Sequence, residues 1–254
     1  MSKEFVDALQ LATRPQSSLR ATGASTAASG PPAPSGTTEK PTGYVAGGSL
    51  VSFVSGVSGQ AQSDVLNSTL LAQLAADKKH DRQKETLPWY DYYVTVLGKI
   101  GWVIQGFDFQ TYSASSTSFT ADKAILEIAA AALTGQEELV VAAVLDGLRE
   151  NADANKGQLQ LFDHQSTSQG QGNFQVSVCN ETGGVVSMQN MAFVFDTSDS
   201  VTNVLFFHFK SDSTKLQSSA QAQTLDEDVY AQVRAAVIEK LGDQAKSFIA
   251  SLDI

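Results

Sequence analysis

The chain of 254 residues contains one cysteine, three histidines and only 17 lysines and arginines. A single cysteine cannot form an internal disulfide, so the fold must be stabilised by packing. His80, His164 and His208 are far apart in the sequence and show no metal-ligand spacing, which predicts that no metal is bound. No run approaches the roughly 18 consecutive apolar residues expected of a transmembrane helix.

Positive charge is also scarce relative to negative charge. The chain has 27 aspartates and glutamates and a formal net charge of -10. Such a surface repels phosphate backbones and anionic headgroups, so we expect no nucleic-acid partner, and any membrane contact must be apolar or acyl-mediated. Gly170 and Gly172 open a dinucleotide-loop pattern, but its third glycine is missing, which predicts no nucleotide.

The first 60 residues are low in complexity. Residues 13–43 are rich in Ser, Thr, Ala, Gly and Pro, a composition typical of disorder. We expect a disordered tail over residues 1–60, with possible short helices at 2–12 and 49–59, and one globular domain over 61–254. The charged start lacks the apolar core of a signal peptide, which favours synthesis in a bacterial cytoplasm and export, if any, by a non-classical route.

The rest of the sequence contains what a mixed fold needs, since 42% of all residues are hydrophobic. Helical spacing gives way to short alternating runs separated by Gly, Asn, Asp and Ser, and then to a final helix that begins with a capping pattern at Thr224. This order predicts an α+β fold in which an antiparallel sheet packs with helices. The predicted helices are 64–81, 87–98, 121–133, 137–149 and one from 224 onward; the predicted strands are 102–113, 158–162, 173–179, 185–195, 201–210 and 215–224.

Cys179 is the candidate functional residue. Strict alternation over 173–179 places Phe174, Val176 and Val178 on one strand face and Cys179 on the other, with polar residues. Three interpretations remain open: a small filler in a covered strand, a catalytic thiolate that uses His164 or His208, and a site of S-acylation. No basic residue or histidine is close to Cys179 in the sequence.

Several segments in the last two thirds of the chain resemble the Erwinia virulence factor (Evf) family. The resemblance covers about residues 86–254 and leaves the Ser/Pro/Gly-rich region unmatched. The segments that carry it are Trp89-Tyr-Asp-Tyr-Tyr93, Gly101-Trp102, Leu161-Phe-Asp163, Gly172-Asn-Phe-Gln175 leading into Cys179, and Val204-Leu-Phe-Phe207.

The resemblance implies a compact α/β body with palmitate thioester-linked to a central cysteine, for which Cys179 is the only candidate. It also implies binding to lipid membranes or vesicles and a role in colonising an insect gut. We therefore expect a non-enzymatic bacterial virulence or host-interaction factor that associates with membranes through acylated Cys179. The alternatives are a toxin-like enzyme with a cysteine nucleophile and an inert binding module with an export tail.

Overall fold

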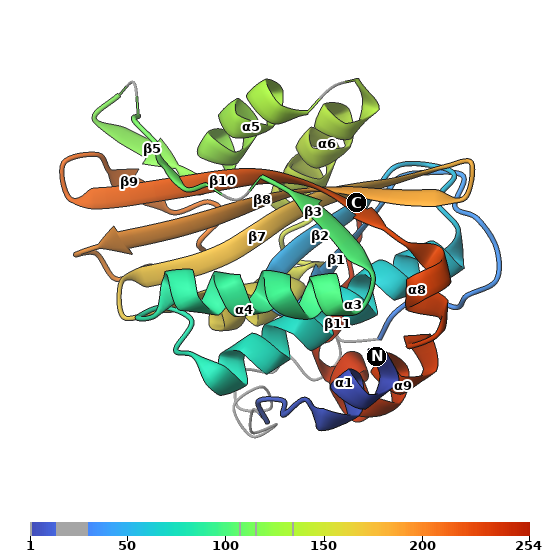
Figure 1. The fold of residues 1–254 in the computed structure, drawn as a ribbon. Helices are drawn as coiled ribbons and strands as arrows, with labels where there is room; N and C mark the ends of the chain where they lie inside the picture. Colours follow the sequence, from blue (N-terminus) through green and yellow to red (C-terminus); the bar gives the residue numbers. More distant parts are fainter. Residues whose placement is uncertain (1, 14–29, 107, 115, 134) are drawn as a thin grey trace.

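The computed structural model describes residues 2–13, 30–106, 108–114, 116–133 and 135–254 (Figure 1). A long sheet lies at the centre of the fold that these residues form, and helices lie against both of its faces. The helices are α1 Ser2–Ala8, α3 Gly59–Lys79, α4 Thr86–Lys99, α5 Ala121–Ala132, α6 Gln136–Glu150, α7 Lys156–Ser166, α8 Glu227–Ala231, α9 Arg234–Leu241 and α10 Asp243–Phe248.

The main sheet has the strand order β11-β1-β2-β7-β8-β10-β3, with β4 paired to β10 and β6 paired to β7. Pairing is antiparallel except between β2 and β7, so the predicted α+β class with an antiparallel sheet is confirmed. The strands are β1 Thr42–Ala46, β2 Ser49–Phe53, β3 Trp102–Gln105, β4 Gln110–Thr111, β5 Ser118–Thr120, β6 Thr167–Ser168, β7 Gln171–Thr182, β8 Val185–Thr197, β9 His208–Lys210, β10 Thr214–Leu225 and β11 Ile249–Ser251.

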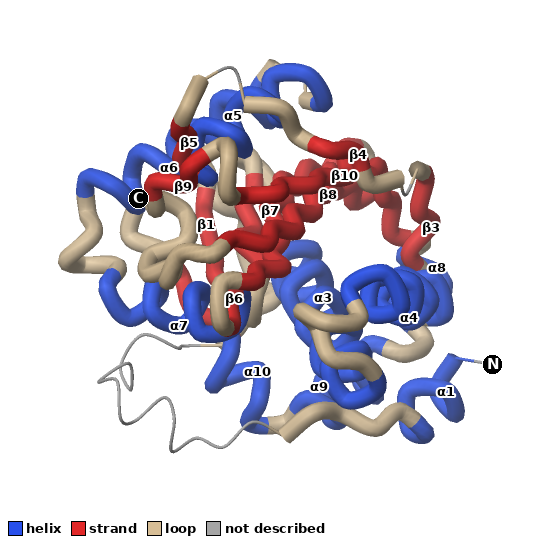
Figure 2. Tube along the Cα trace, turned by 90° about the vertical axis from the view of Figure 1, so that its left-hand side faces the viewer, coloured by secondary structure: helices blue, strands red, loops and turns tan. Residues whose placement is uncertain are grey.

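The two faces of the sheet differ in chemistry. The face that carries Phe174 packs against α7, where Phe162 meets Phe174 edge to face, and α5 and α6 lie on the same side (Figure 2). The other face packs against α3 and α4, since Trp102 of β3 donates a hydrogen bond to Ser68 of α3. We call the first the apolar face and the second the polar face. The helices α8, α9 and α10 and the short α1 lie beyond α3 (Figures 1 and 2).

The predicted tail over residues 1–60 is wrong for most of its length. α1 packs on α9 with Val6 fully buried, and the expected helix at 49–59 is instead β2 and the start of α3. The β1–β2 turn uses Gly47 at φ 59°, a conformation that favours glycine. Both strands are buried on both sides, so the alternation that marks a half-exposed strand is missing. Residues 14–29, within the predicted disorder, lie outside the described residues.

Three other segments differ from the sequence prediction, and the first, residues 102–113, contains the short strands β3 and β4 instead of one strand. Residues 158–162 alternate like a strand but lie in helix α7, because Leu159 and Phe162 are three residues apart and are buried together. Most of the predicted strand at 201–210 is turns, with only β9 extended. The predicted strands at 173–179, 185–195 and 215–224 are confirmed within β7, β8 and β10.

Candidate functional site: Cys179 and the polar face of the sheet

Cys179 lies in the interior part of β7 and is fully buried. Its register partners are Phe53 of β2 and Met188 of β8, and its carbonyl accepts a hydrogen bond from Val54 N–H at 3.0 Å. Alternation along the strand places Asn173 and Cys179 on the same face, and Tyr90 of α4 donates a hydrogen bond to Asn173 on that face. The thiol therefore belongs to the polar face, beneath α3 and α4.

The surroundings of the thiol disfavour its ionisation. Burial raises the pKa of Cys179 well above its ordinary value, and the carboxylate of Glu137 raises it further. His164 and His208 belong to α7 and β9, which cover the apolar face through Phe162 and Phe209. The structure thus places both candidate catalytic bases on the opposite side of the sheet from the thiol.

A row of polar side chains continues from Cys179 across the neighbouring strands. Ser177 donates a hydrogen bond to Asn190, whose register partner on the next strand is Gln221. Ser219 and Gln223 lie two residues on either side of Gln221, so they share its face. We call Ser177, Asn190, Ser219, Gln221 and Gln223 the polar seam. All five residues are at most 3% exposed.

A second polar group lies at the other end of β7 and joins the sheet to the helices. Gln73 of α3 donates hydrogen bonds to Ser49 and to the Ala46 carbonyl, and Arg82 donates to Gln73 and to the Asn173 carbonyl. The Arg82 guanidinium also lies 4.3 Å from the centre of the Trp89 ring. These contacts give a buried cation several acceptors and an aromatic face.

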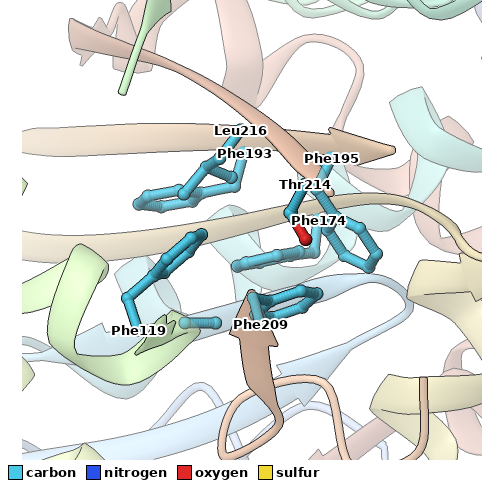
Figure 3. A pocket seen from close by; sticks show the side chains of 8 residues that line it. Phe119, Phe174, Phe193, Phe195, Phe209, Thr214 and Leu216 are labelled. Atoms are coloured by element: carbon cyan, nitrogen blue, oxygen red, sulfur yellow. The ribbon is translucent and has the colours of Figure 1, made fainter. Parts of the chain in front are cut away.

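The apolar face has a different kind of site, shown in Figure 3. A narrow crevice with no room for a water molecule lies beneath the β5–β9 ribbon. The Phe174 and Phe193 rings are stacked 5.0 Å apart, and the Phe119 and Phe209 rings 5.5 Å apart. The residues that line the crevice are Phe119, Ala121, Phe174, Phe193, Phe195, Phe209, Thr214 and Leu216.

Described residues also border three more open clefts. The largest, about 560 Å³, lies between α5 and the β10 edge of the sheet and is bordered by Glu127, Ser218 and Ser219. Clefts of about 330 Å³ and 280 Å³ lie near Gln83 and Gly170. None of these three clefts, nor the phenylalanine crevice, borders Cys179.

Within the described part of the chain, His, Cys, Asp and Glu side chains form no group of three that could hold a metal ion. In the same residues, no helix is both long enough and apolar enough to cross a bilayer.

The fold defines the class as an α+β protein whose central sheet is covered by helices on both faces. No known family model matches the chain, and no curated protein matches its sequence. Among solved structures, the Evf virulence factor, the family that the sequence resembles, is similar over 90% of this chain and 85% of that chain, with 12% identity and a TM-score of 0.34.

Two toxin structures are also distantly similar. A delta-endotoxin matches 65% of this chain and 77% of its own, with 13% identity and a TM-score of 0.35. The activated Cyt2Ba monomer from Bacillus thuringiensis subsp. israelensis matches 54% of this chain and 79% of its own, with 12% identity and a TM-score of 0.31.

Proposed function

We propose that this chain is a non-enzymatic host-interaction factor of the virulence-factor class that associates with lipid membranes through an acyl chain on Cys179. In the family that residues 86–254 resemble, the acyl chain is palmitate and the host tissue is insect gut. The proposal includes synthesis in a bacterial cytoplasm followed by a non-classical export route.

The observation that carries the proposal is the setting of the Cys179 sulfur. Phe53 and Met188 are its partners on the neighbouring strands, and its thiol is fully buried with a raised pKa. Such a position favours an uncharged sulfur, and a thioester has no ionisable proton. Acylation would join the Cys179 sulfur to the acyl carbonyl of a donor thioester and release the thiol of that donor.

None of the four pockets described above borders the unmodified thiol, which is fully buried. The phenylalanine crevice is on the opposite face, and the open clefts do not reach Cys179. An acyl chain on Cys179 therefore takes space that neighbouring side chains fill in the unmodified chain. A palmitoyl chain that leaves the protein interior and enters a bilayer contributes a favourable transfer free energy on the order of 10 kcal/mol, at about 0.8 kcal/mol per methylene. Membrane binding of this kind needs no basic patch.

The second candidate, a cysteine enzyme, is less well supported. A catalytic cysteine must be ionised in the folded protein at every turnover, through a lowered pKa and a neighbouring base, whereas acylation of Cys179 takes place once. Burial and Glu137 act on Cys179 in the opposite direction, and His164 and His208 lie beyond the sheet.

The test is the intact mass of the protein from its native producer, before and after neutral hydroxylamine, combined with vesicle flotation. We expect a hydroxylamine-labile palmitoyl mass and flotation with neutral phosphatidylcholine vesicles, both lost in Cys179→Ser. Ser177→Ala, two residues away on the same strand face, is the matched control and should retain both. An unmodified native mass would contradict acylation and favour the inert binding module.

A further inference from the structure

The polar face of the sheet extends beyond the part that α3 and α4 cover. Asn173 of β7, which accepts a hydrogen bond from α4, is still beneath the helices. Gln171 lies two residues earlier and so on the same face, and its register partners on the neighbouring strands are Asp196 and, one strand further, Lys215. This row borders the cleft of about 330 Å³. Small-molecule sites usually measure about 300–1,000 Å³, so the cleft is large enough for a small ligand.

The polar side chains that border this cleft are not used within the described protein. Asp196 and Lys215 are directly opposite each other on β8 and β10, a position in which Cβ atoms are about 4.5–5.5 Å apart and opposite charges ordinarily pair. Here the two side chains form neither an ion pair nor a hydrogen bond with any described residue. The same holds for the side chains of Gln83, Gln171 and Gln217. A carboxylate, an ammonium and three carboxamides thus remain to bind a ligand.

The charges of the cleft favour a ligand that carries both signs. A simple anion would be attracted by Lys215 and repelled by Asp196, and a simple cation would experience the reverse. A zwitterion can place its ammonium at Asp196 and its carboxylate at Lys215, so that both of its charges are matched by charge-assisted hydrogen bonds. The cleft is therefore complementary to a zwitterion, although the chain as a whole is strongly acidic.

The short separation of the two strand positions favours an α-amino acid. Its ammonium and carboxylate are attached to the same carbon, whereas the charges of a phosphoethanolamine headgroup are separated by a longer chain of atoms. Val194, two residues before Asp196 on the same face, contributes an apolar surface for the carbon skeleton. The carboxamides of Gln171 and Gln217 and the hydroxyl of Thr111 also border the cleft. These groups can donate to and accept from a polar, uncharged side chain of the ligand.

We propose that this cleft is a binding site for a free α-amino acid with a polar, uncharged side chain, in which Asp196 binds the ammonium group and Lys215 binds the carboxylate. The site does not depend on acylation, because Gln171 begins β7 eight residues before Cys179 and the thiol does not border the cleft. Failure of this inference is therefore distinct from failure of the proposed function.

The experiment measures binding of L-glutamine to the full chain by saturation-transfer difference NMR, with a titration that gives the dissociation constant. Two analogues each lack one charge: 4-aminobutanamide has no carboxylate, and glutaramic acid has no ammonium. We expect each analogue to bind at least about tenfold more weakly than L-glutamine, because each leaves one charge of the cleft unmatched. Equal binding of L-glutamine and the analogues would overturn the proposal, as would the absence of saturation transfer from L-glutamine.

Variants of the two charged residues test their roles separately. Asp196 and Lys215 are exposed, so Asp196→Asn and Lys215→Gln should leave the fold intact, and each should weaken L-glutamine binding at least about tenfold. Asp196→Lys combined with Lys215→Asp restores one charge of each sign and should recover the affinity to within about threefold, with the ligand reversed. Lys210→Gln and Asp212→Asn remove exposed charges outside the cleft and are the matched controls, which should bind as the native chain does.

Two further ligands distinguish the α-amino acid from other small molecules. O-phosphoethanolamine carries both charges at a larger separation, and D-glucose carries hydroxyl groups without charge. We expect both to bind more weakly than L-glutamine. Tighter binding of O-phosphoethanolamine would indicate a lipid headgroup site, and tighter binding of D-glucose would indicate a sugar site; either result would overturn the proposal.

Discussion

Gly172 of β7 allows the Phe195 ring to lie directly against the strand. A Cβ at position 172 would overlap the ring atoms Cε1, Cζ and Cδ1 of Phe195. That ring also packs against Phe209 with a centroid distance of 4.9 Å, which restricts its movement. We therefore expect Gly172→Ala to destabilise the protein by about 1–3 kcal/mol through overpacking.

A double-mutant cycle identifies the cause. Phe195→Ala alone removes a buried ring and should cost about 3–5 kcal/mol. In that background the overlap disappears, so adding Gly172→Ala should cost little. The expected interaction free energy is about 1–3 kcal/mol, with the double variant close to Phe195→Ala alone.

Urea unfolding followed by circular dichroism gives the three free energies. Gly98→Ala is the matched control, since Gly98 is in helix α4 and a Cβ there meets no atom within 4 Å. It should raise stability by about 0.5–1 kcal/mol, because alanine is the better helix former. Additive effects of Gly172→Ala and Phe195→Ala would refute the explanation based on overlap.

Two further predictions concern buried polar contacts. Arg234 holds the buried carboxylate of Asp64 in a two-pronged ion pair, so Arg234→Ala should cost roughly 2–4 kcal/mol at pH 7. Burial raises the Asp64 pKa, against the lowering effect of Arg234. The stability lost in Arg234→Ala should therefore become smaller as the pH falls through this raised pKa and Asp64 becomes neutral. A loss of stability that is independent of pH between 7 and 4 would contradict this. Tyr90→Phe removes the hydroxyl that donates to Asn173 at 2.8 Å and should cost about 1–3 kcal/mol in urea unfolding, whereas Tyr92→Phe, on the partly exposed side of α4, should change stability by less than about 0.5 kcal/mol.

The strands around Cys179 could be predicted from sequence because each has a repeating side-chain pattern. Residues 173–179 alternate strictly, and the polar positions 217, 219, 221 and 223 of β10 alternate as well. Alternation shows that the polar residues share a face, but it normally indicates a face exposed to water. That this face is buried under α3 and α4 depends on tertiary packing, so the polar seam could not be recognised.

The N-terminal strands could not be predicted for a related reason. Residues 42–53 are uncharged and buried on both sides, so neither alternation nor helical spacing distinguishes their structure. The Ser repeat at positions 49, 52, 55 and 58 has the period of a helix, yet Ser49 and Ser52 lie in a strand and bond to β7. Their partners, Gln175 and Ser177, are too far away in the sequence to leave a local signal.

The sheet order has a consequence for how the chain reaches its native state. β2 pairs with β7 across 126 residues at Ser49 and Gln175, and β1 pairs with β11 near residue 251. The β1–β2 hairpin is thus synthesised long before its two partner strands, β7 and β11. Strand β11 is synthesised only when nearly the whole of the described chain has been made. Because contacts between distant segments slow folding, the sheet should be completed late in folding, and its unpaired early hairpin is where a chaperone has most to protect.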